Sequence, residues 1–190
     1  MDYFVLDIET CPIDLKGYEE IPEEEQFKKI NPIDSKIVAI GLRYEDENLI
    51  FQSDNEVEIL TKFWMKWKEI KLEHPTLKIV GFNVANFDIS FLTTRSFIND
   101  VSIVPFVLKD VIDIKDKISA YRYGRTRGRL KEFGKLIGME VQEHDGSAIA
   151  DLCKNNEFEK IRKYLIKDLE ITDALYKRLV KTKIIDIAKW

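Results

Sequence analysis

The stretch FVLDIET (residues 4–10) has the composition of a buried β-strand, yet it carries two acids. Because side chains on a strand alternate between the two faces of a sheet, Asp7 and Glu9 point to the same side. They stand roughly 6–7 Å apart along the strand. Two carboxylates on an apolar strand repel each other and lose solvation, so other groups must explain why this pair is tolerated.

The composition is that of one soluble globular domain: 190 residues, 45% hydrophobic, 34% charged. We expect no membrane span, because no apolar run approaches the ~18 residues that one needs. We also expect no signal peptide, because strand-like sequence begins at Tyr3. Only two cysteines, Cys11 and Cys153, make a disulfide framework improbable and favour the reducing cytoplasm. A net charge of −4 excludes a generic nucleic-acid binder, so such contacts need a local basic patch or bound metal.

Hydrophobic periodicity predicts an α/β fold, with strands first and helix-separated strands later. The acidic connection 14–35 reads as a solvated loop or short helix. Trp64 and Trp67, on a helical stripe, are interpreted as core anchors rather than as a base-stacking platform. The strands are expected at 3–9, 36–44, 48–53, 77–82 and 110–114, and the helices at 55–72, 89–97, 129–137 and 157–182. This pattern favours a mixed sheet of about five strands flanked by helices.

A D-x-E pair by itself is weak evidence, since about six acidic pairs are expected by chance in a chain with this acid content. A second acid, Asp88, follows the strand 77–82 and a short loop and opens a helix. It is either a site residue or simply a helix N-cap. Asn83 and Asn86 in the same loop suit an oriented polar site at the end of the strand.

The last helix brings a further carboxylate into the core. Asp168 lies within about 20° of the centre of an apolar stripe at 100° per residue. A carboxylate there is rare unless it is paired or bound to metal, and a buried salt bridge is the alternative. Tyr164, one turn earlier, is either an ordinary core tyrosine or a partner of the same site. The stripe consists of Ile161, Leu165, Thr172, Leu175 and Leu179.

Three core elements thus each bring acids inward: Asp7 with Glu9, then Asp88, then Asp168. At ~5 Å and an effective dielectric of 20, each like-charged pair costs roughly 3 kcal/mol. Such a pocket either holds protons at raised pKa values or binds cations. Oxygen ligands favour Mg²⁺ or Mn²⁺ over zinc, because the two histidines, His74 and His144, are expected at the surface.

The stretches DIET (7–10), NVANFD (83–88) and YLIKD (164–168) resemble the three motifs of the DEDD superfamily of 3′–5′ exonucleases. The nearest likeness is to the proofreading domain of family-B DNA polymerases and its stand-alone relatives. Tyr164 fits the Tyr-x-x-x-Asp motif of the tyrosine subtype (DEDDy), whereas the histidine subtype would have His where Lys163 stands. The resemblance covers residue 3 to about 180, and it implies an RNase H-like fold with one exonuclease domain over 1–190.

The resemblance also implies roles for the matching residues. Asp7 would bridge two divalent ions, Mg²⁺ or Mn²⁺, and Glu9 and Asp168 would hold the ion that activates water. Asp88 would serve the second ion, directly or through water. Tyr164 would orient the attacking water with Glu9. The products would be nucleoside 5′-monophosphates.

Contacts to nucleic acid are expected outside the acids. The basic segment 121–131 is either a phosphate-binding loop, with Tyr121 and Tyr123 as stacking faces, or a plain solvated loop. Arg95 either reaches a phosphate or caps the core. The candidate nucleic-acid-binding residues are Thr10, Asn83, Phe87, Arg122, Arg125, Arg127 and Arg129.

The expected activity is removal of 3′ nucleotides from single-stranded DNA or frayed duplex ends. Two alternatives stay open: the same chemistry on RNA, and a non-catalytic nucleic-acid-binding module that kept the fold. The sequence identifies no polymerase or repair partner.

Overall fold

The computed structural model describes residues 2–122, 128–141 and 148–188. The strands are β1 (Tyr3–Pro12), β2 (Ser35–Tyr44), β3 (Glu47–Gln52), β4 (Lys78–Gly81) and β5 (Val111–Asp113). The helices are α1 (Glu23–Lys28), α2 (Glu56–Glu73), α3 (Asp88–Ile98), α4 (Ile114–Ile118), α5 (Leu130–Leu136), α6 (Ala148–Lys154) and α7 (Phe158–Lys181). Short 3₁₀ turns lie at Tyr18–Glu20, Leu108–Asp110 and Ile184–Asp186.

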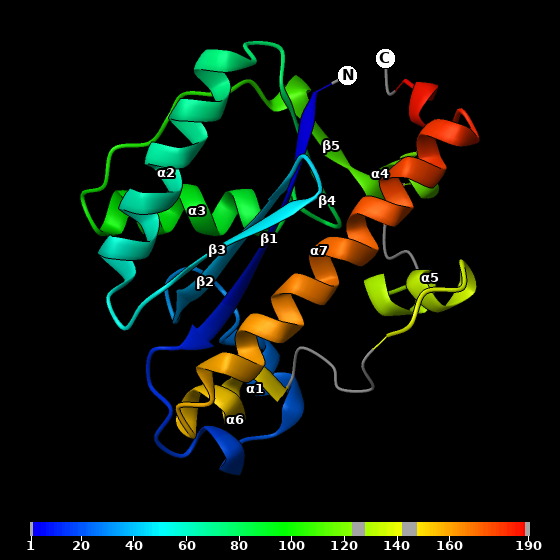
Figure 1. Cartoon of the computed structure of the whole chain (residues 1–190). Coiled ribbons are helices and arrows are strands. Elements are labelled where there is room, and N and C mark those ends of the chain that lie inside the picture. The colour runs from blue at the N-terminus through cyan, green and yellow to red at the C-terminus, as the bar shows by residue number, and fades with distance from the viewer. Residues whose placement is uncertain (1, 123–127, 142–147, 189–190) are drawn as a thin grey trace.

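One mixed sheet of five strands forms the centre of the molecule, in the order β3-β2-β1-β4-β5 (Figure 1). β1 pairs antiparallel with β2 and parallel with β4, and β5 joins parallel to β4. The β2–β3 hairpin turns at Glu45 and Asp46, both with positive φ (49° and 65°), which is the backbone of a two-residue turn that matches strand twist. The mixed α/β sheet expected from the sequence is therefore confirmed.

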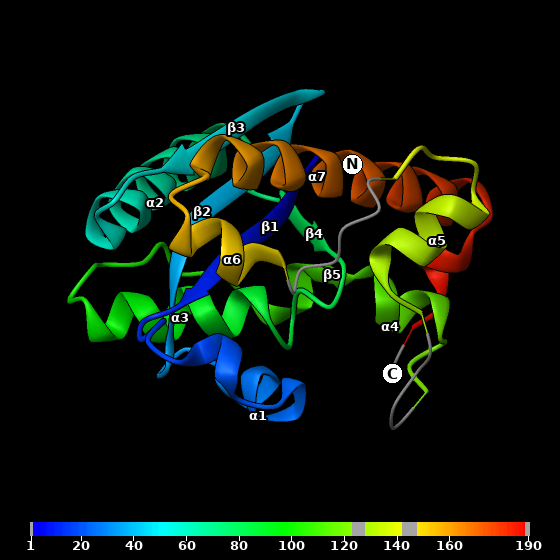
Figure 2. The ribbon, with the colours of Figure 1, turned by 90° about the horizontal axis from the view of Figure 1, so that it is seen from below.

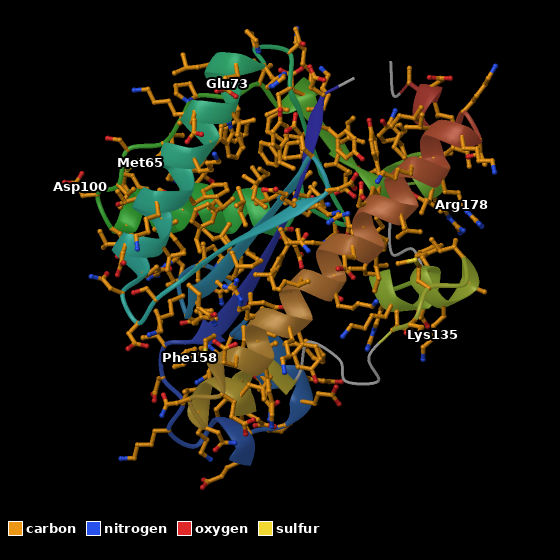
Figure 3. All side chains as sticks on the ribbon, in the orientation of Figure 1. Met65, Glu73, Asp100, Lys135, Phe158 and Arg178 are labelled. Atoms are coloured by element: carbon orange, nitrogen blue, oxygen red, sulfur yellow. A yellow bond between two sulfur atoms is a disulfide. The ribbon has the colours of Figure 1, made fainter. Side chains whose placement is uncertain are left out.

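Helices cover both faces of the sheet, α2 and α3 on one side and α7 on the other (Figure 2). β1 supplies both layers by strand alternation: Phe4, Leu6 and Ile8 pack with α2 and α3, whereas Val5 packs with α7. Figure 3 labels Phe158 and Arg178 near the two ends of α7, which runs obliquely across the sheet. The face that carries Asp7 and Glu9 is thus the one covered by the last helix.

The core is apolar and aromatic on the α2 side. Trp64 and Trp67 are 3% and 1% exposed, and the indole N–H of Trp64 donates to the Ser96 hydroxyl at 2.9 Å. Their interpretation as core anchors is confirmed. The N-terminus of α2 is capped by Asn55, whose side chain accepts the Val57 N–H at 3.0 Å.

Three local expectations need correction. β1 continues past residue 9 to Pro12, through a register shift between Glu9 and Thr10. Two short helices, α4 and α6, were not expected, because five and seven residues carry too little periodicity. The sulfur atoms of Cys11 and Cys153 are joined as a disulfide, which links the end of β1 to α6. The cysteine count argued against this pairing, but a count says nothing about spatial proximity.

Within the described ranges, no helix combines the length and apolar character that spanning a membrane demands. Four residues discussed above lie outside the described residues: Tyr123, Arg125, Arg127 and His144.

Candidate active site

The acids of β1 face α7, as the alternation predicts. Oxygen atoms of Asp7, Glu9 and Asp168 all lie within 4.8 Å of one another. Two of these residues come from the central strand and one from the last helix, 159 or more positions away in the chain. The structure thus brings the strand pair and Asp168 together.

Close packing of α7 on the sheet brings Asp168 to the strand. Gly41 of β2 is the cross-strand partner of Asp7. A Cβ built on Gly41 would lie 2.7 Å from Leu169 Cδ1 and 2.8 Å from Leu165 Cγ. Leu165 and Leu169 are fully buried and flank Asp168 in sequence. The missing side chain at residue 41 therefore lets the helix approach the level at which the three carboxylates meet.

Asp88 joins this group from α3. It is 2% exposed, and its Oδ1 accepts the backbone N–H of Ile8 at 3.0 Å, between Asp7 and Glu9. The helix begins at Asp88 and the N-cap position is Phe87, so the N-cap interpretation of Asp88 is wrong. Its carboxylate binds the strand instead.

Burial raises the pKa of all four carboxylates, and repulsion by the other acids of the group adds to the effect at Asp7 and Glu9. Burial, followed by the charges of Asp88, Asp168 and Glu9, raises the pKa of Asp7 well above its ordinary value. Burial raises the pKa of Glu9 to about 8, that of Asp88 to about 8 and that of Asp168 to about 6. Lys131 opposes the shift, because its charge lowers the pKa of Glu9 and of Asp168.

Asp168 carries an unsatisfied acceptor. Its Oδ1 is buried and has no hydrogen-bond partner among the described residues. Among the described residues, Asp168 forms no ion pair, so the alternative of a buried salt bridge finds no support. A buried, orphaned carboxylate oxygen beside two further carboxylates fits the requirements of a hard divalent cation.

Tyr164 lies on α7 one turn before Asp168. The ammonium of Lys131 sits 5.1 Å from the centre of its ring. The ring also packs against the cluster that includes Leu165 and Ile161. Tyr164 is therefore partly a core tyrosine, which was one of the two alternatives. It also contacts Lys131, whose charge acts on the site.

A cavity of about 590 Å³ opens beside the acids. Four of the candidate nucleic-acid-binding residues line it: Thr10, Asn83, Phe87 and Arg129. Arg122 is exposed and is not among the lining residues. The remaining walls come from α1 and the residues on either side of it (Tyr18, Glu23, Phe27, Ile30), from the start of α5 (Leu130, Lys131) and from α6 (Ile149, Ala150). Ile8, Glu9, Pro12 and Asp168 complete the lining.

Arg95 does not belong to this site. Its guanidinium bonds the carboxylate of Glu56 at 2.5–3.2 Å, and both residues are below 10% exposed. Glu56 also accepts the Ile37 N–H at 2.7 Å, and Arg95 donates to the Pro32 carbonyl. The phosphate interpretation of Arg95 is wrong, because the side chain fastens α3 to α2 and β2.

Sequence reasoning missed several cavity residues. Lys131 appeared only as one member of a basic run, and its proximity to Glu9 and Asp168 depends on how α5 docks on α7. Tyr18 and Phe27 belong to the connection expected to be solvated, yet Tyr18 is only 6% exposed. Aromatic residues in an otherwise acidic connection were the available signal.

Comparison with known proteins shows which family this chain resembles. The model of the family described as DNA polymerase family B, exonuclease domain, matches residues 11–135, about two thirds of the chain. Asp7, Glu9, Tyr164 and Asp168 lie outside those matched residues. An uncharacterized protein of Methanocaldococcus jannaschii, MJ0365, is 32% identical over 171 residues, which is 83% of this chain and 93% of that protein.

The structure of the family B DNA polymerase from the hyperthermophilic archaeon Pyrobaculum calidifontis superposes with a TM-score of 0.70. The match covers 96% of this chain at 14% identity, so it concerns the fold. The chain spans about a quarter of that polymerase chain. Together the family match and the shared fold show that this chain belongs to the family of exonuclease domains of family B DNA polymerases, 3′–5′ exonuclease domains of the DEDD superfamily.

Proposed function

We propose that this protein is a metal-dependent 3′–5′ exonuclease of the tyrosine subtype, built as one domain over residues 1–190. Its substrate is the 3′ end of single-stranded DNA or of a frayed duplex, and its products are nucleoside 5′-monophosphates. The observation that carries the proposal is the meeting of carboxylates from β1 and α7 beside a nucleotide-sized cavity, with one buried Asp168 oxygen unsatisfied among the described residues.

Mg²⁺ or Mn²⁺ fits this donor set, since it consists of hard oxygens and the three-residue cluster contains neither histidine nor cysteine. Asp7, Glu9 and Asp168 would hold one ion, and Asp7 with Asp88 would serve a second. When bound, the ions supply activation of water and stabilisation of the departing 3′ oxygen in an in-line displacement. Binding cations also offsets the mutual repulsion that helps to raise the pKa of Asp7 and Glu9.

The chain's own residues orient the reactants. We assign to Glu9 and the Tyr164 hydroxyl the positioning of the attacking water, because Glu9 lies beside Asp168 and Tyr164 stands one turn before Asp168 on α7. Lys131 keeps Glu9 and Asp168 closer to their ionised forms and offers its ammonium to the scissile phosphate. Arg129, which lines the same cavity, is assigned to the next phosphate along the strand.

The cavity also suits a single nucleotide. Its volume of about 590 Å³ falls within the range of small-ligand sites. Phe87 and Phe27 present aromatic surface, and Phe27 is 51% exposed. Such faces stack on bases only after the bases leave a duplex, which favours single-stranded or frayed ends. Thr10 and Asn83 provide polar contacts to sugar and phosphate.

The test is a digestion panel with 3′-labelled oligonucleotides: single-stranded DNA, paired duplex, duplex with a 3′ mismatch, and RNA of the same sequence, each with Mg²⁺ or Mn²⁺. We expect single-stranded and mismatched DNA to be shortened fastest. Faster digestion of RNA would reassign the substrate to RNA with the same chemistry. If wild type and Asp7→Ala bound every oligonucleotide equally and digested none, the protein would be a non-catalytic binding module instead.

A further inference from the structure

Asp113, at the end of β5, is a buried acid outside the motif residues. It is 6% exposed. Its Oδ1 accepts the backbone N–H groups of Asn83 and Lys115, each at 3.0 Å, and of Asp116 at 3.4 Å. Its Oδ2 accepts the N–H of Ala85 at 3.2 Å. One carboxylate thus satisfies four backbone donors from two separate segments.

Two of these four hydrogen bonds belong to the N-terminus of α4. The bonds to Lys115 and Asp116 are those of an ordinary helix N-cap. The bonds to Asn83 and Ala85 reach 30 and 28 residues back, respectively, to the loop between β4 and α3. An N-cap alone would need a single oxygen and could be supplied by serine or asparagine, so the carboxylate's acceptor capacity serves the loop.

The loop that Asp113 holds has an unfavourable backbone. Asn83 adopts φ 61°, the left-handed region that costs a non-glycine residue roughly 1 kcal/mol. The Asn83 carbonyl accepts the N–H of Asn86 at 3.2 Å and of Phe87 at 3.1 Å, so this turn closes immediately before Asp88. A fixed Asn83 therefore determines where α3 starts.

Asp88 is the first residue after the loop. Its carboxylate accepts the Ile8 N–H at 3.0 Å, between the two acids of β1. The segment 83–88 is thus fastened at one end to Asp113 and at the other to β1. A shift of the loop would move Asp88, whose side chain has to meet the other carboxylates.

We propose that Asp113 is a positioning residue of the exonuclease site, which sets the place of Asp88 and Asn83 by holding the loop between β4 and α3. The proposal rests on the proposed function for its catalytic consequence, and on geometry alone for its structural one. The negative charge of Asp113 also raises the pKa of Asp88, so this carboxylate repels Asp88 while it holds the loop that precedes it.

Two substitutions separate positioning from stability. Asp113→Asn keeps the shape but has one acceptor oxygen for four donors, and Asp113→Ser keeps an N-cap for α4 while losing the loop bonds. Asp173→Asn is the matched control. Asp173 is likewise buried (5% exposed) and binds the Tyr3 hydroxyl at the start of β1, Arg43 near the end of β2, and Lys177.

The first readout is the amide ¹⁵N–¹H spectrum of the metal-free variants. We expect the Ile8 amide, which reports the Asp88 contact, to shift in both Asp113 variants and to stay in place in Asp173→Asn. The second readout is the Mn²⁺ concentration at half-maximal thermal stabilisation, which should rise about tenfold or more in the Asp113 variants. The control should lower the melting temperature and leave that midpoint within about twofold.

The third readout is digestion of single-stranded DNA. The Asp113 variants should lose about tenfold or more in kcat and change KM by a smaller factor, because the displaced Asn83 is only one of several proposed contacts to the strand. An unchanged Ile8 amide and Mn²⁺ midpoint in both Asp113 variants would overturn the proposal and leave Asp113 a structural residue. If wild type digests nothing, the proposed function fails, and the amide and Mn²⁺ readouts decide the role of Asp113 alone.

Discussion

Gly41 and Leu169 are in such close contact that no side chain fits between them. A Cβ on Gly41 would stand 2.7 Å from Leu169 Cδ1, well inside the range of real contacts. Gly41 is paired with Asp7 across the β1–β2 ladder, and Leu169 directly follows Asp168. The packing of one glycine therefore sets the separation between the two motifs that supply three of the four acids.

Gly41→Ala is expected to push α7 away from the sheet. Overpacking of this kind typically costs about 1–3 kcal/mol of unfolding free energy. The same displacement moves Asp168 from Asp7 and Glu9, so the Mn²⁺ midpoint should rise as the melting temperature falls. Both quantities come from thermal melting across a Mn²⁺ titration.

Gly138→Ala is the control for this prediction. Gly138 has φ 86°, and a Cβ there would meet no atom within 4 Å. Alanine strains the backbone without moving α7, so the melting temperature should fall while the Mn²⁺ midpoint stays constant. Equal effects of the two substitutions on the midpoint would argue against the helix-spacing explanation.

The metal-free protein should lose stability as pH rises. The folded pKa values of Glu9 and Asp88, about 8, and of Asp168, about 6, exceed the ordinary values of 4.5 and 3.8. The native state then binds more protons than the unfolded state between those limits, so this stabilisation is complete at about pH 4 and is lost by about pH 8. Thermal melting in EDTA from pH 5 to about 8.5 measures the decline.

Stabilisation of the protein by Mn²⁺ should show the complementary dependence on pH. Cations bind the ionised carboxylates, so stabilisation by Mn²⁺ should grow over this pH range. Asp7→Asn removes one charge from the group, and in EDTA its melting temperature should fall less with pH than that of wild type. A melting temperature of wild type that is flat in EDTA and unmoved by Mn²⁺ would contradict a shared carboxylate site.

Lys131→Met should make the site harder to ionise. Removing the ammonium raises the pKa of Glu9 and Asp168, since its charge is what lowers them. The acidic limb of the pH–kcat profile should therefore move to higher pH, and activity near neutral pH should fall about tenfold or more. The measurement is the digestion rate of single-stranded DNA across pH at saturating Mn²⁺.

Lys135→Met is the matched control for Lys131. Lys135, which is labelled in Figure 3, lies four residues later on α5 and is exposed. This substitution removes the same charge from the same helix and should leave the pH profile in place. A parallel shift in both variants would show that net charge, rather than the placement of Lys131, matters.

Arg95→Met should affect folding and not substrate binding. It leaves the buried Glu56 carboxylate without its charged partner, and breaking a buried pair typically costs about 3–5 kcal/mol. Denaturant unfolding measures the loss, and Glu56→Gln/Arg95→Met should recover part of it. The KM for single-stranded DNA should remain within about twofold of wild type at a temperature where the variant is folded. An increase in KM with unchanged stability would restore the phosphate-binding interpretation.

Much of the site could be predicted because its acids sit in periodic elements. Strand alternation puts Asp7 and Glu9 on one face, and the helical stripe puts Asp168 inward, so local geometry alone brings them to the core. Asp88 was located at the end of a strand for the same reason. Its partner, the Ile8 N–H, was not predictable, because that contact joins segments 80 residues apart.

The residues that sequence reasoning missed act through tertiary contacts. Gly41 reads as an ordinary strand residue until α7 is docked on it, and Lys131 reads as one cation of many. The connection 14–35 looked solvated by composition, yet Tyr18 and Phe27 form a wall of the cavity. The phosphate interpretation of Arg95 was wrong because an arginine near a motif gives no sign of its partner Glu56, which lies 39 residues earlier in the chain.

The metal-dependent exonuclease activity is tested most directly by the products that wild type, Asp7→Ala and Asp168→Asn form over time from a single-stranded DNA oligonucleotide in Mn²⁺. We predict that wild type shortens a 5′-labelled strand one nucleotide at a time from its 3′ end and releases nucleoside 5′-monophosphates. Thermal melting should show that both variants are folded, and both should release at least about a hundredfold less nucleoside 5′-monophosphate than wild type. Equal release by all three proteins, or shortening from the 5′ end, would contradict it.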